Sequence, residues 1–212
     1  GQNLLQALGN GTSRLSAARI RDAGFSDLLL SADDRIVLAQ SINLDLSGSI
    51  TLSSANIVGT GSTASTLRAP VVVLGNLDIL PVAAATGPGG EALPVNAAPG
   101  STGGQARLDV DASVIDVVGE SGLSGFASVR LSAARDGRTD GEIRLRGRAR
   151  DETSTTLIGS LLFSGELTLH AGQIYPTTLS TFALTGTTGQ SSLIVSAPRL
   201  AGGAAAPAAP LS

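Results

Sequence analysis

The sequence contains no Cys, Met, Trp or Lys, and it has one His, one Tyr and four Phe in 212 residues. Without Cys, the chain is neither a disulfide scaffold nor a Cys-ligated metal protein, and one His cannot form a His cluster. We therefore expect no metal site and no cofactor. Charged residues are 15% of the chain, too few for a coiled coil. A net charge of −3, with Arg supplying all 14 basic residues, argues against nucleic acid as a partner.

The apolar part of the chain is aliphatic, because hydrophobic residues make up 42% and aromatic residues 2%. It contains no apolar run of about 18 residues, so the sequence predicts no membrane-spanning segment. The chain starts at Gly1 with neither an initiator Met nor a signal-peptide pattern. We therefore expect it to be a piece of a longer protein.

A short phrase recurs along the chain: an aliphatic residue, any residue, Ala, two further residues and a second aliphatic residue. Its copies occupy residues 15–20, 67–72, 110–115, 169–174 and 195–200, with partial copies at 30–32, 52–55 and 131–133. Repetition at uneven spacing is typical of a solenoid whose loops differ in length. The first copy lies in a run of helix formers between Ser13 and Gly24, which predicts a short N-terminal helix there.

Apolar and polar residues alternate within most copies, as in half-buried β-strands. Alternating segments occur at 44–47, 50–53, 129–132, 143–146 and 167–170, separated by Gly, Asn, Asp and Ser clusters. Stacked aliphatic residues and few aromatic ones favour an all-β fold, a parallel β-helix with about 20 residues per coil. The small Ala after each strand suits a tight corner. A β-sandwich is the main rival, but the absence of Trp and the repeat spacing argue against it.

The expected organisation is one β-helix domain over residues 13–200. Residues 83–106 are rich in Ala, Gly and Pro, and they predict a low-complexity loop excursion. Residues 201–212 have a similar composition and predict a flexible C-terminal linker.

Three segments resemble the filamentous haemagglutinin family of bacterial exoproteins. They are residues 23–38, 48–52 and 167–178. The resemblance implies a right-handed β-helix, two-partner secretion through an outer-membrane secretion partner, and a location that is secreted or at the cell surface. The family's N-terminal secretion signatures are missing here, so the chain would be internal or C-terminal shaft of a larger parent exoprotein. The implied function is structural and adhesive, without catalysis.

Enzymes are the alternative, because polysaccharide lyases and polygalacturonases also use β-helices and need clustered carboxylates. The candidates are Asp33 with Asp34, and Asp109 with Asp111 and Asp116. Asp109 and Asp111 share a strand face, which we interpret as the solvated face opposite inward-pointing Val110. We expect a turn at Asp33 and Asp34. The single His170 alternates with Leu167 and Leu169, which places it outside and gives it no catalytic role.

Four arginines, Arg144, Arg146, Arg148 and Arg150, follow one another at every second position. On a strand they would leave the same face, with Ile143, Leu145 and Ala149 pointing inward. Such a row predicts a site for anionic surface glycans at Arg144, Arg146 and Arg148, through bidentate contacts. The competing interpretation is a solvated face whose arginines are partnered by nearby acids. These are Asp140, Glu142, Asp151 and Glu152.

Overall fold

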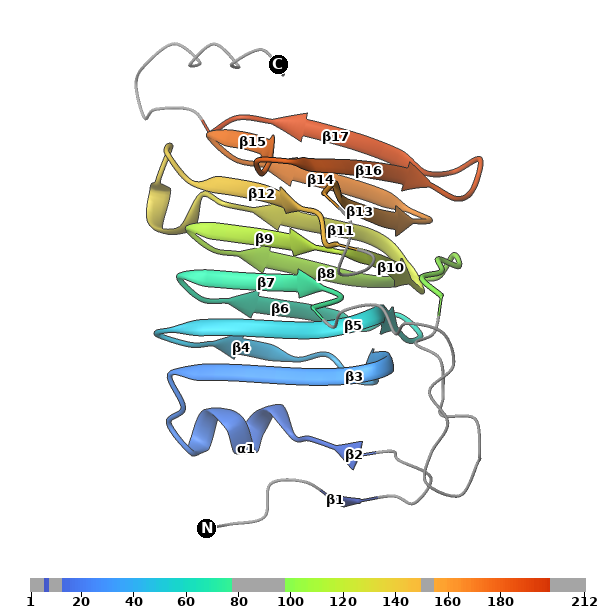
Figure 1. Cartoon of the computed structure of the whole chain (residues 1–212). Helices are drawn as coiled ribbons and strands as arrows, with labels where there is room; N and C mark the ends of the chain where they lie inside the picture. Colours follow the sequence, from blue (N-terminus) through green and yellow to red (C-terminus); the bar gives the residue numbers. More distant parts are fainter. Residues whose placement is uncertain (1–5, 8–12, 78–97, 150–154, 199–212) are drawn as a thin grey trace, which may run out of the picture.

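The computed structural model describes residues 6–7, 13–77, 98–149 and 155–198 and shows an all-β protein of mainly parallel strands (Figure 1). One sheet contains β3 Asp27–Leu38, β5 Ser49–Gly59, β7 Val71–Gly75, β9 Val114–Val118, β10 Glu120–Ser124, β12 Glu142–Arg146, β13 Leu157–Phe163, β15 Gln173–Pro176 and β16 Ser180–Gly186. The other contains β4 Asn43–Asp45, β6 Ala64–Arg68, β8 Ala106–Asp111, β11 Phe126–Ser132, β14 Glu166–His170 and β17 Ser192–Ser196. Two short strands, β1 Gln6–Ala7 and β2 Ser13–Arg14, pair antiparallel.

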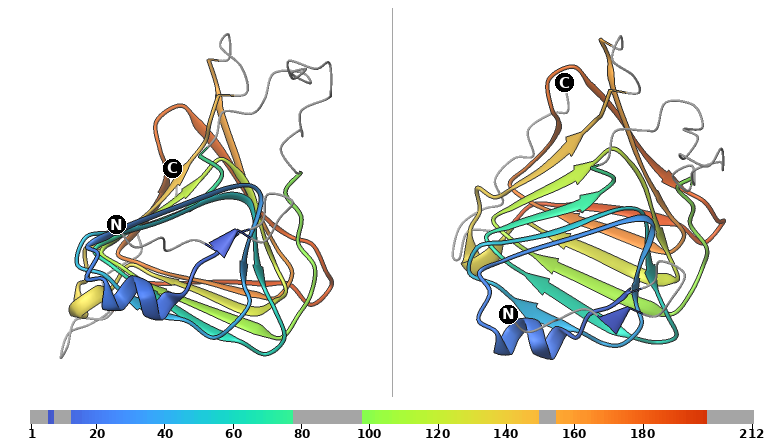
Figure 2. Two further views of the ribbon diagram at one scale, coloured as in Figure 1. Left: turned by 90° about the horizontal axis from the view of Figure 1, so that it is seen from below. Right: turned by 60° about the horizontal axis from the view of Figure 1, so that its bottom comes forward.

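The chain passes repeatedly from one sheet to the other, and most strands lie parallel to a strand from the previous pass. Hydrogen bonds accordingly join residues 22 positions apart, as between Asp27 and Ser49. The first half of β5 pairs with β7 and its second half with β10. The larger sheet therefore has two limbs, which with the smaller sheet enclose the core in a roughly triangular outline (Figure 2).

Register places the aliphatic residues of the recurring phrase on top of one another. One column in the six-stranded sheet consists of Leu44, Leu67, Val110, Leu131, Leu169 and Val195. Leu67, Leu131 and Leu169 are at most 1% exposed, which confirms that they are buried. The predicted parallel pairing is also confirmed. Four of these strands, β6, β8, β11 and β14, are each followed by a buried Ala that forms the corner: Ala69, Ala112, Ala133 and Ala171.

A second column crosses the larger sheet and contains Leu28, Ile50, Val72, Ile115, Ile143 and Ile174. β-branched residues suit these pleated, closely stacked positions. Two of the four phenylalanines, Phe126 and Phe163, also reach the core. The interior is thus filled mainly by aliphatic side chains, as the composition indicates.

The predicted N-terminal helix is present as α1 Ala17–Asp22, capped by the Ser16 side chain, which accepts a hydrogen bond from Arg19 N. Its one buried residue, Ile20, packs onto the core beside β4. The helix lies beyond β3 and β4 at the N-terminal end of the stack (Figure 1). Residues 17–20 of the first copy of the phrase are therefore helical.

One local expectation differs from the structure. Asp33 and Asp34 form a β-bulge inside β3 rather than a turn, because the register with β5 shifts between Ala32 and Arg35. In the predicted excursion, residues 98–105 lie against the stack: Asn56 Oδ1 accepts a hydrogen bond from Gly100 N at 2.8 Å. Residues 83–97 of that excursion, and the predicted linker 201–212, lie outside the described residues.

Candidate functional site

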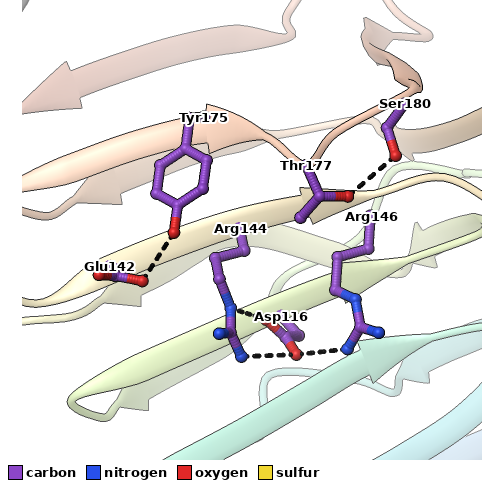
Figure 3. Close-up of polar contacts among 7 residues, drawn as sticks. All are labelled: Asp116, Glu142, Arg144, Arg146, Tyr175, Thr177 and Ser180. Carbon is purple, nitrogen blue, oxygen red and sulfur yellow. Dashed lines mark hydrogen bonds and ion pairs between the residues drawn. The ribbon is translucent and has the colours of Figure 1, made fainter.

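The candidate site lies on the outer face of β9 and β12, which are neighbouring parallel strands. Register sets Arg144 opposite Asp116 and Arg146 opposite Val118. Ile143 and Leu145 point inward and are buried, so period-two alternation turns Arg144 and Arg146 outward together. Figure 3 shows both guanidinium groups directed at the Asp116 carboxylate.

Asp116 holds both arginines. Its Oδ1 accepts from Arg144 Nε at 2.6 Å, and its Oδ2 accepts from Arg144 Nη2 at 3.0 Å and from Arg146 Nη1 at 2.8 Å. The Asp116 side chain is 3% exposed, whereas those of Arg144 and Arg146 are 34% and 49% exposed. The hydrogen bond to Asp116 raises the pKa of Arg144 above its already high value. A buried carboxylate thus fixes two partly exposed guanidinium groups side by side.

The next strand, β15, adds an aromatic residue beside this group. Tyr175 lies opposite Arg144 in register, and its hydroxyl donates to Glu142 Oε2 at 2.8 Å (Figure 3). That hydrogen bond to the carboxylate raises the pKa of Tyr175, because losing the phenol proton would set two negative charges against each other. We call Asp116, Glu142, Arg144, Arg146 and Tyr175 the arginine cluster.

The predicted row of arginines is interrupted after Arg146. Gly147 lies so close to Leu157 that a side chain would meet the Leu157 backbone at 2.5 Å. Arg148 then leaves β12 and forms an isolated antiparallel bridge with Ile158. The expectation of one continuous strand face is therefore wrong at Arg148, and Ala149 is half-buried rather than a core residue. Arg150 lies outside the described residues.

A turn from β15 to β16 holds the end of β12 in place. Thr177 N donates to Leu145 O at 3.0 Å, and Ser180 Oγ accepts from Gly147 N at 3.0 Å. The Thr177 and Ser180 hydroxyls are 2.9 Å apart (Figure 3). Two neighbouring strands therefore set the direction of the chain between Arg146 and Arg148.

The aspartates considered for catalysis do not converge. Asp109 and Asp111 lie on the outer face of β8 with Val110 buried between them, which confirms the solvated-face interpretation. Asp111 pairs with Arg68 at 3.3 Å. Asp116 lies on the other sheet, bound to Arg144 and Arg146. Within the described residues, His, Cys, Asp and Glu form no group of three or more that could hold a metal ion.

His170 lies on the outer face of β14, as the alternation predicts. Its Nδ1 is 2.8 Å from Ser196 Oγ on β17. Partial burial, and to a lesser extent the positive charge of Arg130, lower its pKa. The lowered pKa favours the neutral form of the ring, and the contact with Ser196 links the two strands.

Sequence reasoning found the two cluster arginines but missed their principal partner. It proposed acids adjacent in the chain, whereas Asp116 comes from the preceding pass, 28 residues before Arg144. It also missed a second charge network, in which Arg135 contacts Asp45 and Asp136, while Asp136 receives Arg68 at 2.7 Å. Contacts between segments far apart in the chain create both groups.

No helix in the described part of the chain is long and apolar enough to cross a membrane. Comparisons with known proteins give no match to any family model, any curated protein or any solved structure.

Proposed function

We propose that the chain is a right-handed parallel β-helix that serves as a structural and adhesive segment of a large secreted bacterial exoprotein. In this role it extends and displays the parent protein and contacts surface glycans of host or neighbouring cells. The observation that carries the proposal is the aliphatic column from Leu44 to Val195, which runs through every strand of the six-stranded sheet. The resemblance to the filamentous haemagglutinin family adds secretion and surface display to the proposal.

The physical properties of such a stack suit a spacer. Parallel strands lie about 4.8 Å apart, and every added pass lengthens the stack without changing its cross-section. Each pass buries its side chains on those of its neighbours, so a force along the stack is resisted by many hydrogen bonds and packed residues at once. The outer charges support this interpretation over the enzyme alternative, because Asp111 and Asp116 are each bound to arginine.

The arginine cluster is the proposed glycan contact, together with Arg148. Counted together, Arg144, Arg146 and Arg148 outnumber the two carboxylates, Asp116 and Glu142, so the group carries a net positive charge. Asp116 fixes the orientation of Arg144 and Arg146 in advance and so lowers the entropy lost on binding. Guanidinium groups held side by side match the sulfate and carboxylate groups of anionic glycans.

Heparin binding at low salt tests the contact. The test variant must leave Asp116 one arginine partner, because removing both Arg144 and Arg146 would leave a buried carboxylate without its partners. The test variant is therefore Arg146→Ser/Arg148→Ser. The control is Arg107→Ser, because Arg107 is an exposed arginine on β8 in the other sheet. The double variant is expected to lose most binding, and Arg107→Ser to retain it. Equal binding by both variants would refute the contact.

The location is tested by applying an antiserum against this chain to intact cells of the organism that makes it. Labelling of unbroken cells, or antigen in the medium, is expected; antigen found only after lysis would refute the proposal. The enzyme alternative predicts unsaturated sugars released from polygalacturonate. We expect none, with or without Ca²⁺.

A further inference from the structure

The last strand of the smaller sheet, β17, has one paired edge and one open edge. It pairs with β14 on one side, and among the described residues no strand pairs with the other side. Ser192 N donates to Gly165 O, and Ser196 O accepts from Ala171 N. In a parallel ladder alternate residues bond to the same neighbour. The backbone groups of Leu193 and Val195 therefore point toward the open edge.

The same two residues continue the inward columns of the core. Leu193 lies above Leu167 and Val195 above Leu169 in register. Leu167 and Leu169 are at most 1% exposed, but Leu193 is 44% and Val195 61% exposed. Among the described residues, nothing pairs with the open edge of these two core positions at one end of the stack. The opposite end is different, since α1 packs Ile20 onto the core there.

From this we infer that β17 pairs antiparallel with β17 of a second copy, joining two stacks end to end through a twofold axis at Ile194. The strand sequence, Ser-Leu-Ile-Val-Ser, is nearly the same in both directions and carries no charge. Pairing around Ile194 sets Leu193 against Val195 of the other copy, so the residues with outward-facing backbone groups exchange hydrogen bonds.

The symmetry also preserves the core. A twofold axis along the sheet normal reverses the strand direction but keeps inward side chains inward. Leu193 and Val195 of one copy therefore cover those of the other, and the aliphatic column continues across the junction. Because α1 occupies the other end, the contact closes as an isologous pair rather than a filament. An uncharged apolar strand with an open edge is well suited to such pairing.

Sedimentation velocity of the full chain over a concentration series tests the inference. The unsubstituted chain is expected to sediment as a dimer that dissociates on dilution. Val195→Pro removes an edge N–H without breaking the ladder to β14, and Val195→Lys adds a charge at the twofold contact; both are expected to sediment as monomers. Leu29→Lys is the control, since Leu29 is 69% exposed on β3, far from β17.

Circular dichroism of each variant establishes that the strands remain folded, and Val195→Lys retains the test if Val195→Pro unfolds. A monomeric unsubstituted chain at every concentration would overturn the inference. So would a dimer that persists in folded Val195 variants, because the contact would then lie elsewhere. If a chain of residues 1–198 dimerises while the full chain of residues 1–212 stays monomeric, residues 199–212 cover this end. That result would equally overturn the inference.

Discussion

Replacing Leu131 by Ala removes a side chain at the centre of the aliphatic column. Leu131 is 0% exposed and lies between Val110 and Leu169 in register. Losing three carbon atoms costs about 2.4 kcal/mol at roughly 0.8 kcal/mol for each buried methylene. The backbone ladders on both sides hold Val110 and Leu169 in place, so the cavity stays open and adds roughly 24 cal/mol per Å³. We expect unfolding free energy to fall by about 3–5 kcal/mol.

Urea unfolding followed by circular dichroism measures this loss, with the slope of the transition compared to show that the same surface is exposed. Leu29→Ala is the matched control: it makes the same chemical change at a side chain that is 69% exposed, and should cost less than about 0.5 kcal/mol. A loss below about 1 kcal/mol for Leu131→Ala, or equal losses for the two variants, would refute the stacked-column reasoning.

Three further results are expected. Asp116→Asn should lower the unfolding free energy by about 1–3 kcal/mol in urea titrations, because hydrogen bonds between charged groups are lost, whereas Asp109→Asn on an exposed strand face should change it by less than about 0.5 kcal/mol. Stability should fall as pH drops below about 6.5, since the lowered pKa of His170 lets the unfolded chain bind the proton first; His170→Gln should remove that part of the pH dependence. Asp27 accepts hydrogen bonds from Ser26 and Ser49 that lower its pKa. Its contribution to the unfolding free energy should therefore be present above the ordinary carboxyl pKa and be lost as the pH falls through the lowered value. Comparing the unfolding free energies of Asp27→Asn and the unsubstituted chain across acid pH measures this contribution.

Much of the architecture could be predicted because the stack repeats its local pattern. Alternation identified β4, β5, β11, β12 and β14, and the aliphatic residue of the recurring phrase identified one core column, from Leu67 to Val195. The Ser16-capped helix followed from local helix signals. These features depend on residues close in the chain, where sequence alone is informative.

The failures share a physical cause, which is register between distant strands. The partner of Arg144 could not be read locally, because 28 residues separate it from Asp116 and the intervening loops differ in length. Asp33 and Asp34 suggest a turn by composition, yet the strand tolerates both as a bulge because their side chains face solvent. Gly147 ends the arginine row through contact with Leu157, on a neighbouring strand.

Engineered disulfides test the parallel stacking most directly, since the chain contains no Cys of its own. Asp109 and Arg130 are register partners on adjacent strands, and Thr168 is the partner of Arg130 one strand further. Adjacent positions fall within the Cα separation of about 4.4–6.8 Å that a disulfide requires, whereas positions two strands apart do not. Under mild oxidation Asp109→Cys/Arg130→Cys is expected to cross-link within one chain and Asp109→Cys/Thr168→Cys to stay reduced. Cross-linking of the second pair, or failure of the first in a folded variant, would contradict the parallel stack.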